Sequence, residues 1–279
     1  MGMKIFFSKL FYYSGIFDIL KKVNPSNNKY ILMFHGVSKN KSNSLNQHLQ
    51  PHLDIKQFEN IIKMLNEHYC FLKPDEILNN KRKGILLTFD DGFQNNYNNV
   101  IPILNSYNIP GLFFISTQHV IEPNNWLSFI KQNMNKYMVN QDILSEDIKI
   151  DYFDGLTKDQ ILEMANNPLH TIGSHTVTHP DLTKLSVTSI DSELINSKNY
   201  LENITNKPIE YFAYPYGNYN EIVIENVKKA GYKAAFGIDK INLFGESNFE
   251  IPRIGIYDDS KYYITAKLSV LNQKSVQGN

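Results

Sequence analysis

A repeated alternation between short apolar runs and segments of helical character constrains the fold of this chain more than any other feature. Apolar runs at residues 30–34, 84–89 and 111–115 are separated by segments at 55–69 and 95–107 that we expect to be helical. Short apolar runs are typical of buried strands, and a helix between consecutive strands makes those strands parallel. We therefore predict an α/β fold built around a parallel sheet.

The rest of the chain continues this pattern, with one interruption. Further strands are expected at residues 170–173, 209–213, 234–238 and 251–257, and further helices at residues 157–166, 187–201 and 221–230. Residues 118–156 are rich in Asn and Asp and show no clear period, so we expect an irregular insertion over one edge of the sheet. No linker divides the chain, which we interpret as one domain at residues 29–279 preceded by a segment at residues 1–28.

The N-terminal segment has the pattern of an amphipathic helix. From Met3 to Lys22, aromatic and aliphatic side chains share one helical face, and several lysines lie outside it. Two alternatives stay open: this helix contacts a membrane surface, or it packs on the protein itself. It is too short to span a bilayer and a poor signal peptide. We therefore expect a cytoplasmic protein, peripheral to the inner face of the membrane on the first alternative.

The composition excludes some partners. Its 28 basic residues balance 28 acidic ones, so no nucleic-acid footprint is expected. The single cysteine, Cys70, excludes an internal disulfide and agrees with a reducing compartment. Because Cys70 closes a helical pattern, we expect a buried thiol. The composition does not set the oligomeric state.

Two adjacent carboxylates follow the apolar run at residues 84–89. Asp90 and Asp91 precede Gly92, and an ionised Asp beside a buried strand is costly unless it is paired or binds a metal. The carboxyl ends of strands are also where parallel sheets and barrels place their active sites. Since neighbouring residues at a strand end point in different directions, the two carboxylates can have different roles. We predict that this edge is catalytic.

A pair of histidines follows the expected strand at residues 170–173. His175 and His179 are four positions apart, so a helical turn would place both on one face, where they can bind one metal ion. The spacing alone is a weak signal. It gains force because the strand end brings the pair to the same edge as Asp90 and Asp91.

A Pro–Gly turn follows the expected strand at residues 209–213. In Tyr214-Pro215-Tyr216-Gly217, backbone N–H groups that point inward would form an oxyanion hole. An ordinary tight turn is the alternative for this motif taken alone.

These motifs, Thr88-Phe89-Asp90-Asp91-Gly92, then the His pair, then the Tyr-Pro-Tyr-Gly turn, resemble those of the polysaccharide deacetylases of the NodB-homology type, carbohydrate esterase family 4. The resemblance implies an α/β fold of the deformed (β/α)7-barrel type over about residues 29–260, with the insertion over its catalytic edge.

The same resemblance implies the roles of the motif residues. Asp91, His175 and His179 would bind a divalent metal; this ligand set suits Zn²⁺, and Co²⁺ or Ni²⁺ can occupy such sites. Asp90 would be the general base, and the backbone N–H of Tyr216 would hold the oxyanion.

Two positions depart from the family pattern. Many members carry an Arg just before the third motif, where this chain has Ala213, and we expect Arg253 to reach the same carboxylate from a late strand. The late His that supplies the acid is also absent, because no His follows His179. His35, after the first strand, is its expected substitute. In this the chain resembles the branch that acts on poly-N-acetylglucosamine, although a lone His at a strand end is often structural.

These expectations predict a metal-dependent carbohydrate N-deacetylase, a hydrolase acting on C–N bonds other than peptide bonds. Its partner would be an N-acetylated surface glycan or a lipid-linked amino sugar precursor. Two alternatives remain: a catalytically silent glycan-binding protein on the same fold, and a hydrolase of O-acetyl or formyl groups. The turn residues Tyr214, Pro215 and Tyr216 are expected to contact the substrate. Trp126 either stacks on a sugar or packs against the barrel.

Overall fold

The computed structural model describes most of the chain from Lys29 onwards. The described residues are 29–39, 52–79, 83–121, 126–140, 142, 144–238, 247–257 and 264. The N-terminal segment at residues 1–28, where we expect an amphipathic helix, lies outside them. The choice between membrane contact and packing on the protein therefore stays open. Within these ranges, none of the helices is both long and apolar enough to cross a membrane.

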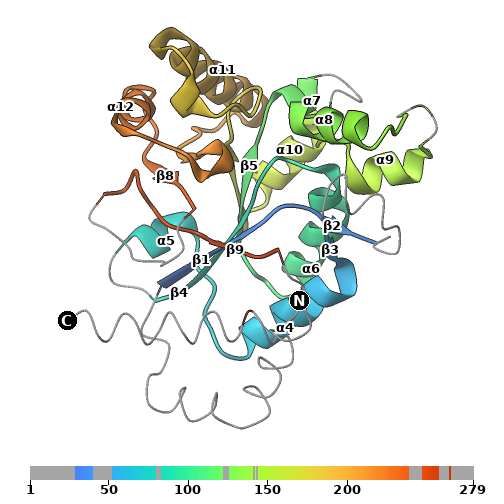
Figure 1. The fold of residues 1–279 in the computed structure, drawn as a ribbon. Helices are drawn as coiled ribbons and strands as arrows, with labels where there is room; N and C mark the ends of the chain where they lie inside the picture. The colour runs from blue at the N-terminus through green and yellow to red at the C-terminus, as the bar shows by residue number, and fades with distance from the viewer. Residues whose placement is uncertain are drawn as a thin grey trace, which may run out of the picture.

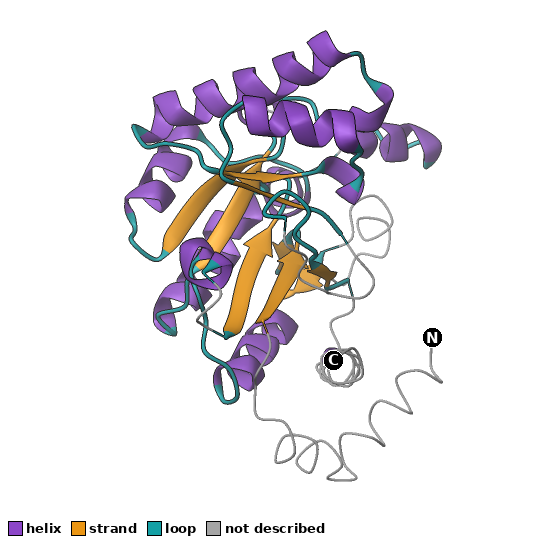
Figure 2. Cartoon of the chain, turned by 90° about the vertical axis from the view of Figure 1, so that its left-hand side faces the viewer, coloured by secondary structure: helices purple, strands orange, loops and turns teal. Residues whose placement is uncertain are grey.

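Seven parallel strands form the main sheet (Figures 1 and 2). Their order is β8-β7-β6-β5-β4-β1-β9. The strands are β1 (Lys29–Phe34), β4 (Gly84–Phe89), β5 (Gly111–Ile115), β6 (His170–Ser174), β7 (Tyr211–Ala213), β8 (Ala234–Phe236) and β9 (Ile254–Gly255). A second sheet pairs β2 (Val37–Ser38) with β3 (Leu53–Asp54) in parallel. The predicted α/β fold with a parallel sheet is confirmed.

Burial on both faces explains why the strands read as continuous apolar runs. In β4, alternate residues join two hydrophobic clusters: Ile85 and Leu87 pack in the larger one, and Leu86 packs in the smaller one. The larger cluster includes apolar residues of the surrounding helices, and the smaller one is made mostly of strand residues. Parallel sheets covered on both faces characteristically lack a polar–apolar alternation.

Helices connect successive strands and lie outside the sheet (Figure 2). They are α4 (Ile55–Asn66), α5 (Pro74–Leu78), the π-helix η1 (Asn96–Val100), α6 (Ile101–Ser106), α10 (Lys158–Asn166), α11 (Val187–Thr205) and α12 (Glu221–Lys229). Their ends follow sequence signals: Asp54 accepts the backbone N–H groups of Lys56 and Gln57, and Thr157 forms a capping box with Gln160.

A late segment at residues 251–256, which we call the closing segment, joins the two edges of the sheet. Ile251 exchanges backbone hydrogen bonds with β8, donating to Ala235 at 3.1 Å and accepting from Gly237 at 2.9 Å. Three residues later β9 pairs with β1, and Ile256 N donates to Met33 O at 2.9 Å. The predicted strand at residues 251–257 is therefore a bridge followed by a two-residue strand. This closure confirms the deformed (β/α)7-type barrel.

The insertion is more ordered than its sequence indicates. Its residues form α7 (Gln118–Ile121), α8 (Ser128–Lys136) and α9 (Glu146–Tyr152), and α8 and α9 share a hydrophobic cluster (Figure 1). Trp126 is 1% exposed in that cluster, packs on Phe153 with ring centroids 5.0 Å apart, and donates through Nε1 to Asp154 at 2.7 Å. Of the two alternatives for Trp126, stacking on a sugar or packing inside the protein, the structure shows packing.

Cys70 is exposed, so the prediction of a buried thiol is wrong. Helix α4 ends at Asn66, and Cys70 lies beyond it in an extended stretch. Its backbone carbonyl accepts the N–H of Ile85 at 2.9 Å, which fixes the chain beside β4 while the side chain faces outward.

Candidate active site

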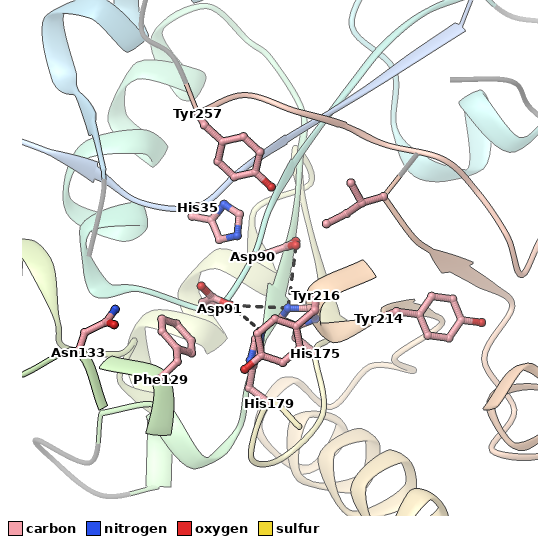
Figure 3. A pocket seen from close by; sticks show the side chains of 11 residues that line it. His35, Asp90, Asp91, Phe129, Asn133, His175, His179, Tyr214, Tyr216 and Tyr257 are labelled. Carbon is pink, nitrogen blue, oxygen red and sulfur yellow. Dashed lines mark ion pairs between the residues drawn. The ribbon is translucent and has the colours of Figure 1, made fainter. Parts of the chain in front are cut away.

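The two carboxylates lie where β4 ends, and they point in different directions (Figure 3). Asp90 N still donates to Phe34 O at 3.0 Å, so Asp90 extends the sheet by one residue. Asp91 then adopts a left-handed backbone with φ of 73°, and Gly92 follows with φ of 76°. A Cβ on Gly92 would lie 2.9 Å from Ile115, so only glycine fits this turn. Both carboxylates are 2% exposed.

The two histidines converge on Asp91, but not through a helical turn. Thr176 and His179 have φ of 70° and 58°, so they lie in a strained loop and the predicted turn is wrong. His175 Nδ1 donates to Ala213 O at 2.8 Å, which turns Nε2 toward Asp91. The Nε2 atoms of His175 and His179 lie 3.6 and 3.4 Å from Asp91 Oδ1 (Figure 3).

These three side chains fit a divalent cation. Their ligand atoms lie within 4.8 Å of one another, and Asp91 Oδ1 is buried without a hydrogen-bond partner. Burial lowers the pKa of His175 to about 4 and of His179 well below its usual value, so both rings are neutral. Burial and the charge of Asp90 raise the pKa of Asp91. A carboxylate and two neutral imidazoles are ligands of Zn²⁺-like metals.

Arg253 reaches Asp90 from the closing segment, as the sequence predicts. It forms a two-pronged ion pair, with Nη1–Oδ1 at 2.6 Å and Nη2–Oδ2 at 2.8 Å. The guanidinium is fully buried, donates through Nε to Gly237 O at 3.1 Å, and lies 5.3 Å from the Phe114 ring centroid. Burial raises the pKa of Asp90, but the charge and the hydrogen bonds of Arg253 outweigh that effect, so the pKa lies below its usual value. Asp90 is therefore held in its ionised form, as a general base would have to be.

His35 lies directly after β1 and faces the same cavity (Figure 3). Its ring is 5.8 Å from the ring of Tyr257, centroid to centroid. Burial lowers its pKa, the charge of Asp90 raises it, and that of Arg253 lowers it again. The structure places His35 beside Asp90 as predicted, while its role as the acid stays a prediction.

The Tyr-Pro-Tyr-Gly turn lies against the histidine loop. It forms the 3₁₀ turn η4 (Pro215–Gly217), and Tyr216 has a left-handed φ of 59°. The Tyr216 ring packs edge-on against His179, with centroids 4.7 Å apart, and is 51% exposed. Tyr214 is buried, and its hydroxyl donates to Phe249 O at 2.9 Å. This hydrogen bond ties the turn to the chain just before the closing segment.

One cavity of about 400 Å³ brings these groups together. It is lined by His35, Asp90, Asp91, Phe129, Asn133, His175, His179, Tyr214, Tyr216, Ile238 and Tyr257. Sequence reasoning missed three of these: Asn133, Ile238 and Tyr257. Phe129 is one of the aromatic residues of the insertion, for which stacking on a sugar and packing against the barrel were the two expectations. Tyr257 carried a usable signal, because it ends the same expected strand as Arg253. Phe129 and Asn133 come from α8, whose helical pattern the polar composition of the insertion conceals.

The barrel and its buried Asp–His–His cluster define a class of protein: α/β-barrel enzymes with a candidate cation site at the carboxyl ends of the strands. A family model described as polysaccharide deacetylase matches residues 78–235. The chain belongs to this family.

Individual relatives agree with that assignment. The Poly-beta-1,6-N-acetyl-D-glucosamine N-deacetylase of Staphylococcus aureus is 31% identical over 264 residues, covering 91% of this chain and 82% of the relative. The Streptococcus pyogenes deacetylase PplD, solved in complex with acetate, superposes with a TM-score of 0.65 at 25% identity, covering 85% of this chain and 96% of that one. The structure of IcaB from Ammonifex degensii shares the fold, with a TM-score of 0.66 at 21% identity, covering 87% of this chain and 97% of that one.

Proposed function

We propose that this protein is a metal-dependent N-deacetylase that removes acetyl groups from amino sugars of a surface polysaccharide or its lipid-linked precursor. The observation that carries the proposal is the pairing of Asp90 with Arg253 beside the Asp91, His175 and His179 cluster in one cavity. An ionised carboxylate next to a cation site can activate a water molecule for attack on an amide.

Asp91, His175 and His179 would hold the cation. A divalent ion bound there supplies Lewis-acid chemistry, activating a water and polarising the amide carbonyl. Zn²⁺ suits these ligands, with Co²⁺ and Ni²⁺ as alternatives.

The chain's own residues divide the proton transfers. Asp90 accepts a proton from the attacking water, whose oxygen bonds to the acyl carbon. Arg253 keeps Asp90 ionised and fixes its orientation. The backbone N–H of Tyr216 stabilises the negative charge that develops on the carbonyl oxygen. His35 protonates the sugar nitrogen as the C–N bond breaks, which leaves a free amine and acetate.

The walls of the cavity support a sugar substrate. Tyr216 and Tyr257 are 51% and 67% exposed at its mouth, and aromatic faces of this kind pack on the apolar faces of sugar rings. The name of the Staphylococcus aureus relative describes a substrate that is a polymer of N-acetylglucosamine. We infer the same class of N-acetylated glycan for this chain.

The alternatives differ in what they require of Asp90. A silent glycan-binding protein was suggested by Ala213 in place of the family's Arg, and the Arg253–Asp90 pair removes that reason. A hydrolase of O-acetyl or formyl groups would use the same residues, so substrate tests have to separate it from an N-deacetylase.

The test is release of acetate and of free amine from N-acetylglucosamine oligomers and from polyprenyl-linked amino sugars. We expect turnover by the wild type, loss of turnover in Asp90→Asn, and retention of metal in that variant. A metal-loaded wild type that is inert on all N-acetylated glycans contradicts the proposal. Binding without turnover would identify the silent protein, and release from O-acetyl or formyl substrates alone would identify the other hydrolase.

The cytoplasmic location, with the segment from Met3 to Lys22 at the membrane surface, also stays a proposal. Fractionation of cells that express the full chain tests it, and recovery outside the cytoplasm contradicts it.

A further inference from the structure

The loop that carries both histidine ligands is held in a conformation that its residues disfavour. Thr176 has φ of 70° and His179 has φ of 58°. Left-handed backbone is uncommon outside glycine, and for a β-branched residue such as Thr176 it is a genuine outlier. Strain of this kind persists only where the surroundings over-determine it. The contacts of the loop therefore decide where His179 points.

One side chain from outside the loop supplies the strongest of those contacts. Glu193, on α11, accepts the backbone N–H groups of Val177 and Thr178 through Oε2, at 2.7 and 2.9 Å. Its other oxygen, Oε1, accepts the hydroxyl of Thr178 at 2.7 Å. The following N–H, that of His179, is accepted within the loop by Thr176 Oγ1 at 3.0 Å.

A single carboxylate thus fixes both residues at the centre of the loop. Hydrogen bonds to an ionised acceptor are short and about twice as strong as neutral ones. The successive N–H groups of Val177 and Thr178 donate to the same oxygen atom, Glu193 Oε2. This shared acceptor restricts rotation of the backbone between His175 and His179. The segment after β5 also contacts the loop backbone: His175 N donates to Ile115 O at 2.9 Å, and Thr176 O and Val177 O accept from Thr117 N and Gln118 N at 3.1 and 2.9 Å. None of these bonds involves the N–H groups that Glu193 accepts.

We propose that Glu193 is a positioning residue of the cation site, which holds His179 where its Nε2 faces Asp91. This inference rests on the proposed function, because it takes Asp91, His175 and His179 as the metal ligands. Groups that orient metal ligands from behind typically contribute about 10- to 100-fold to metal affinity. Glu193 acts through the loop backbone and does not touch the ligand atoms or the cavity.

Two substitutions separate the hydrogen bonds of Glu193 from its charge. Glu193→Ala removes all three bonds. Glu193→Gln keeps a carbonyl oxygen for the Val177 and Thr178 N–H groups, and its amide can donate to the Thr178 hydroxyl once that group turns round.

Glu202 provides a matched control on the same helix. It accepts the N–H of Ile209 at 3.0 Å and pairs with Lys198 at 3.3 Å. Glu202→Ala therefore also removes a carboxylate that accepts a backbone N–H, at a position without a hydrogen bond to the histidine loop.

The experiment measures the affinity of the full-length protein for Zn²⁺ and Co²⁺ by competition with a chelator, together with the thermal stability of the metal-free form. We expect Glu193→Ala to weaken metal binding by about 10- to 100-fold, with Glu193→Gln close to wild type. Glu202→Ala should bind metal as the wild type does, even where it lowers the metal-free melting temperature as much as Glu193→Ala.

Wild-type metal affinity in Glu193→Ala overturns the inference. So does an equal loss of affinity in Glu202→Ala, or a loss in Glu193→Gln as deep as in Glu193→Ala. Metal affinity is measured without a substrate, so this experiment can contradict the role of Glu193 without contradicting the deacetylase function, and the reverse also holds. A wild type that cleaves no N-acetyl group, while Glu193→Ala still loses metal, contradicts the deacetylase and supports the role of Glu193.

Discussion

The two neighbouring carboxylates depend on opposite environments. Asp90 is compensated by the guanidinium of Arg253 and has a lowered pKa, whereas Asp91 has a buried oxygen without a partner and a raised pKa. Two aspartates that are adjacent in the sequence therefore have different electrostatic environments. One is paired with a buried cationic side chain, and the other belongs to the candidate cation site.

Arg253→Lys should move the acid limb of the pH–activity profile to higher pH. Arg253 lowers the pKa of Asp90, and a lysine cannot reproduce the two-pronged pair. The pKa of Asp90 therefore rises, and the base stays protonated up to a higher pH. Profiles of kcat/KM against pH measure the shift, and an unchanged acid limb would argue against this role.

Arg253→Ala should be destabilised by about 3–5 kcal/mol, because it leaves Asp90 buried without its cation. Urea unfolding measures this, with Asp90→Asn/Arg253→Ala as the control that removes both charges. A single variant as stable as the wild type would contradict the dependence of Asp90 on Arg253.

His35→Asn should lower kcat by about 10²- to 10⁴-fold and leave metal affinity intact. The reason is that His35 lies in the cavity but outside the Asp–His–His cluster. Turnover kinetics and metal titration check the two parts. Full turnover with bound metal would show that the acid lies elsewhere.

At the scale of elements, strand β6 has a buried histidine at its start as well as the ligand His175 just beyond its end. His170 is 5% exposed, and its Nε2 lies 2.9 Å from Asn105 Oδ1. Asn105 Oδ1 also accepts a hydrogen bond from the Asn167 side-chain amide. Because this oxygen can only accept, His170 donates to it, and the ring proton of His170 is on Nε2. Burial lowers the pKa of His170 to about 4.

His170→Gln should flatten the loss of stability in acid. The folded-state pKa is depressed, so the unfolded chain takes up a proton below about pH 6.5 while the folded chain does not. This stabilisation is present near pH 7 and is lost as the pH falls from about 6.5 to about 4, by at most about 3 kcal/mol. Urea unfolding of the metal-free protein across that range measures it. His68→Gln changes an exposed histidine and is the control; equal slopes in both variants would contradict the prediction.

At the scale of the whole molecule, the cation should stabilise the barrel. Its candidate ligands come from the ends of two strands, so binding links parts of the chain about 85 positions apart. At a free concentration about 100 times Kd, Zn²⁺ should add about 2.7 kcal/mol to the free energy of unfolding. Thermal melts with metal and with chelator measure it. Asp91→Asn should lose the effect, and Asp142→Asn, an exposed carboxylate, should keep it.

The sequence predicts the parallel sheet because the strands of the main sheet are marked locally, by apolar runs that end in a polar motif or a turn. The barrel was predicted from the resemblance of the three motifs to those of a known family. The sequence also predicts Asp90, Asp91, His175 and His179 as neighbours, because parallel strands end at one edge. The conformation of the histidine loop was mispredicted, since Glu193, from a different helix, stabilises a backbone that local spacing does not favour. Trp126 was ambiguous for a similar reason: its environment exists only once α8 and α9 pack together.

The closing segment has a consequence for how activity arises during synthesis. Arg253 is 163 positions from Asp90 along the chain, so every strand from β4 to β8 is made before the guanidinium is available. Until then Asp90 lacks the cation that compensates its burial. A nascent chain that stops before Ile251 would carry all three motifs but no poised base. On the proposed function, the ionised base would therefore be complete only after the closing segment has joined the two edges of the barrel.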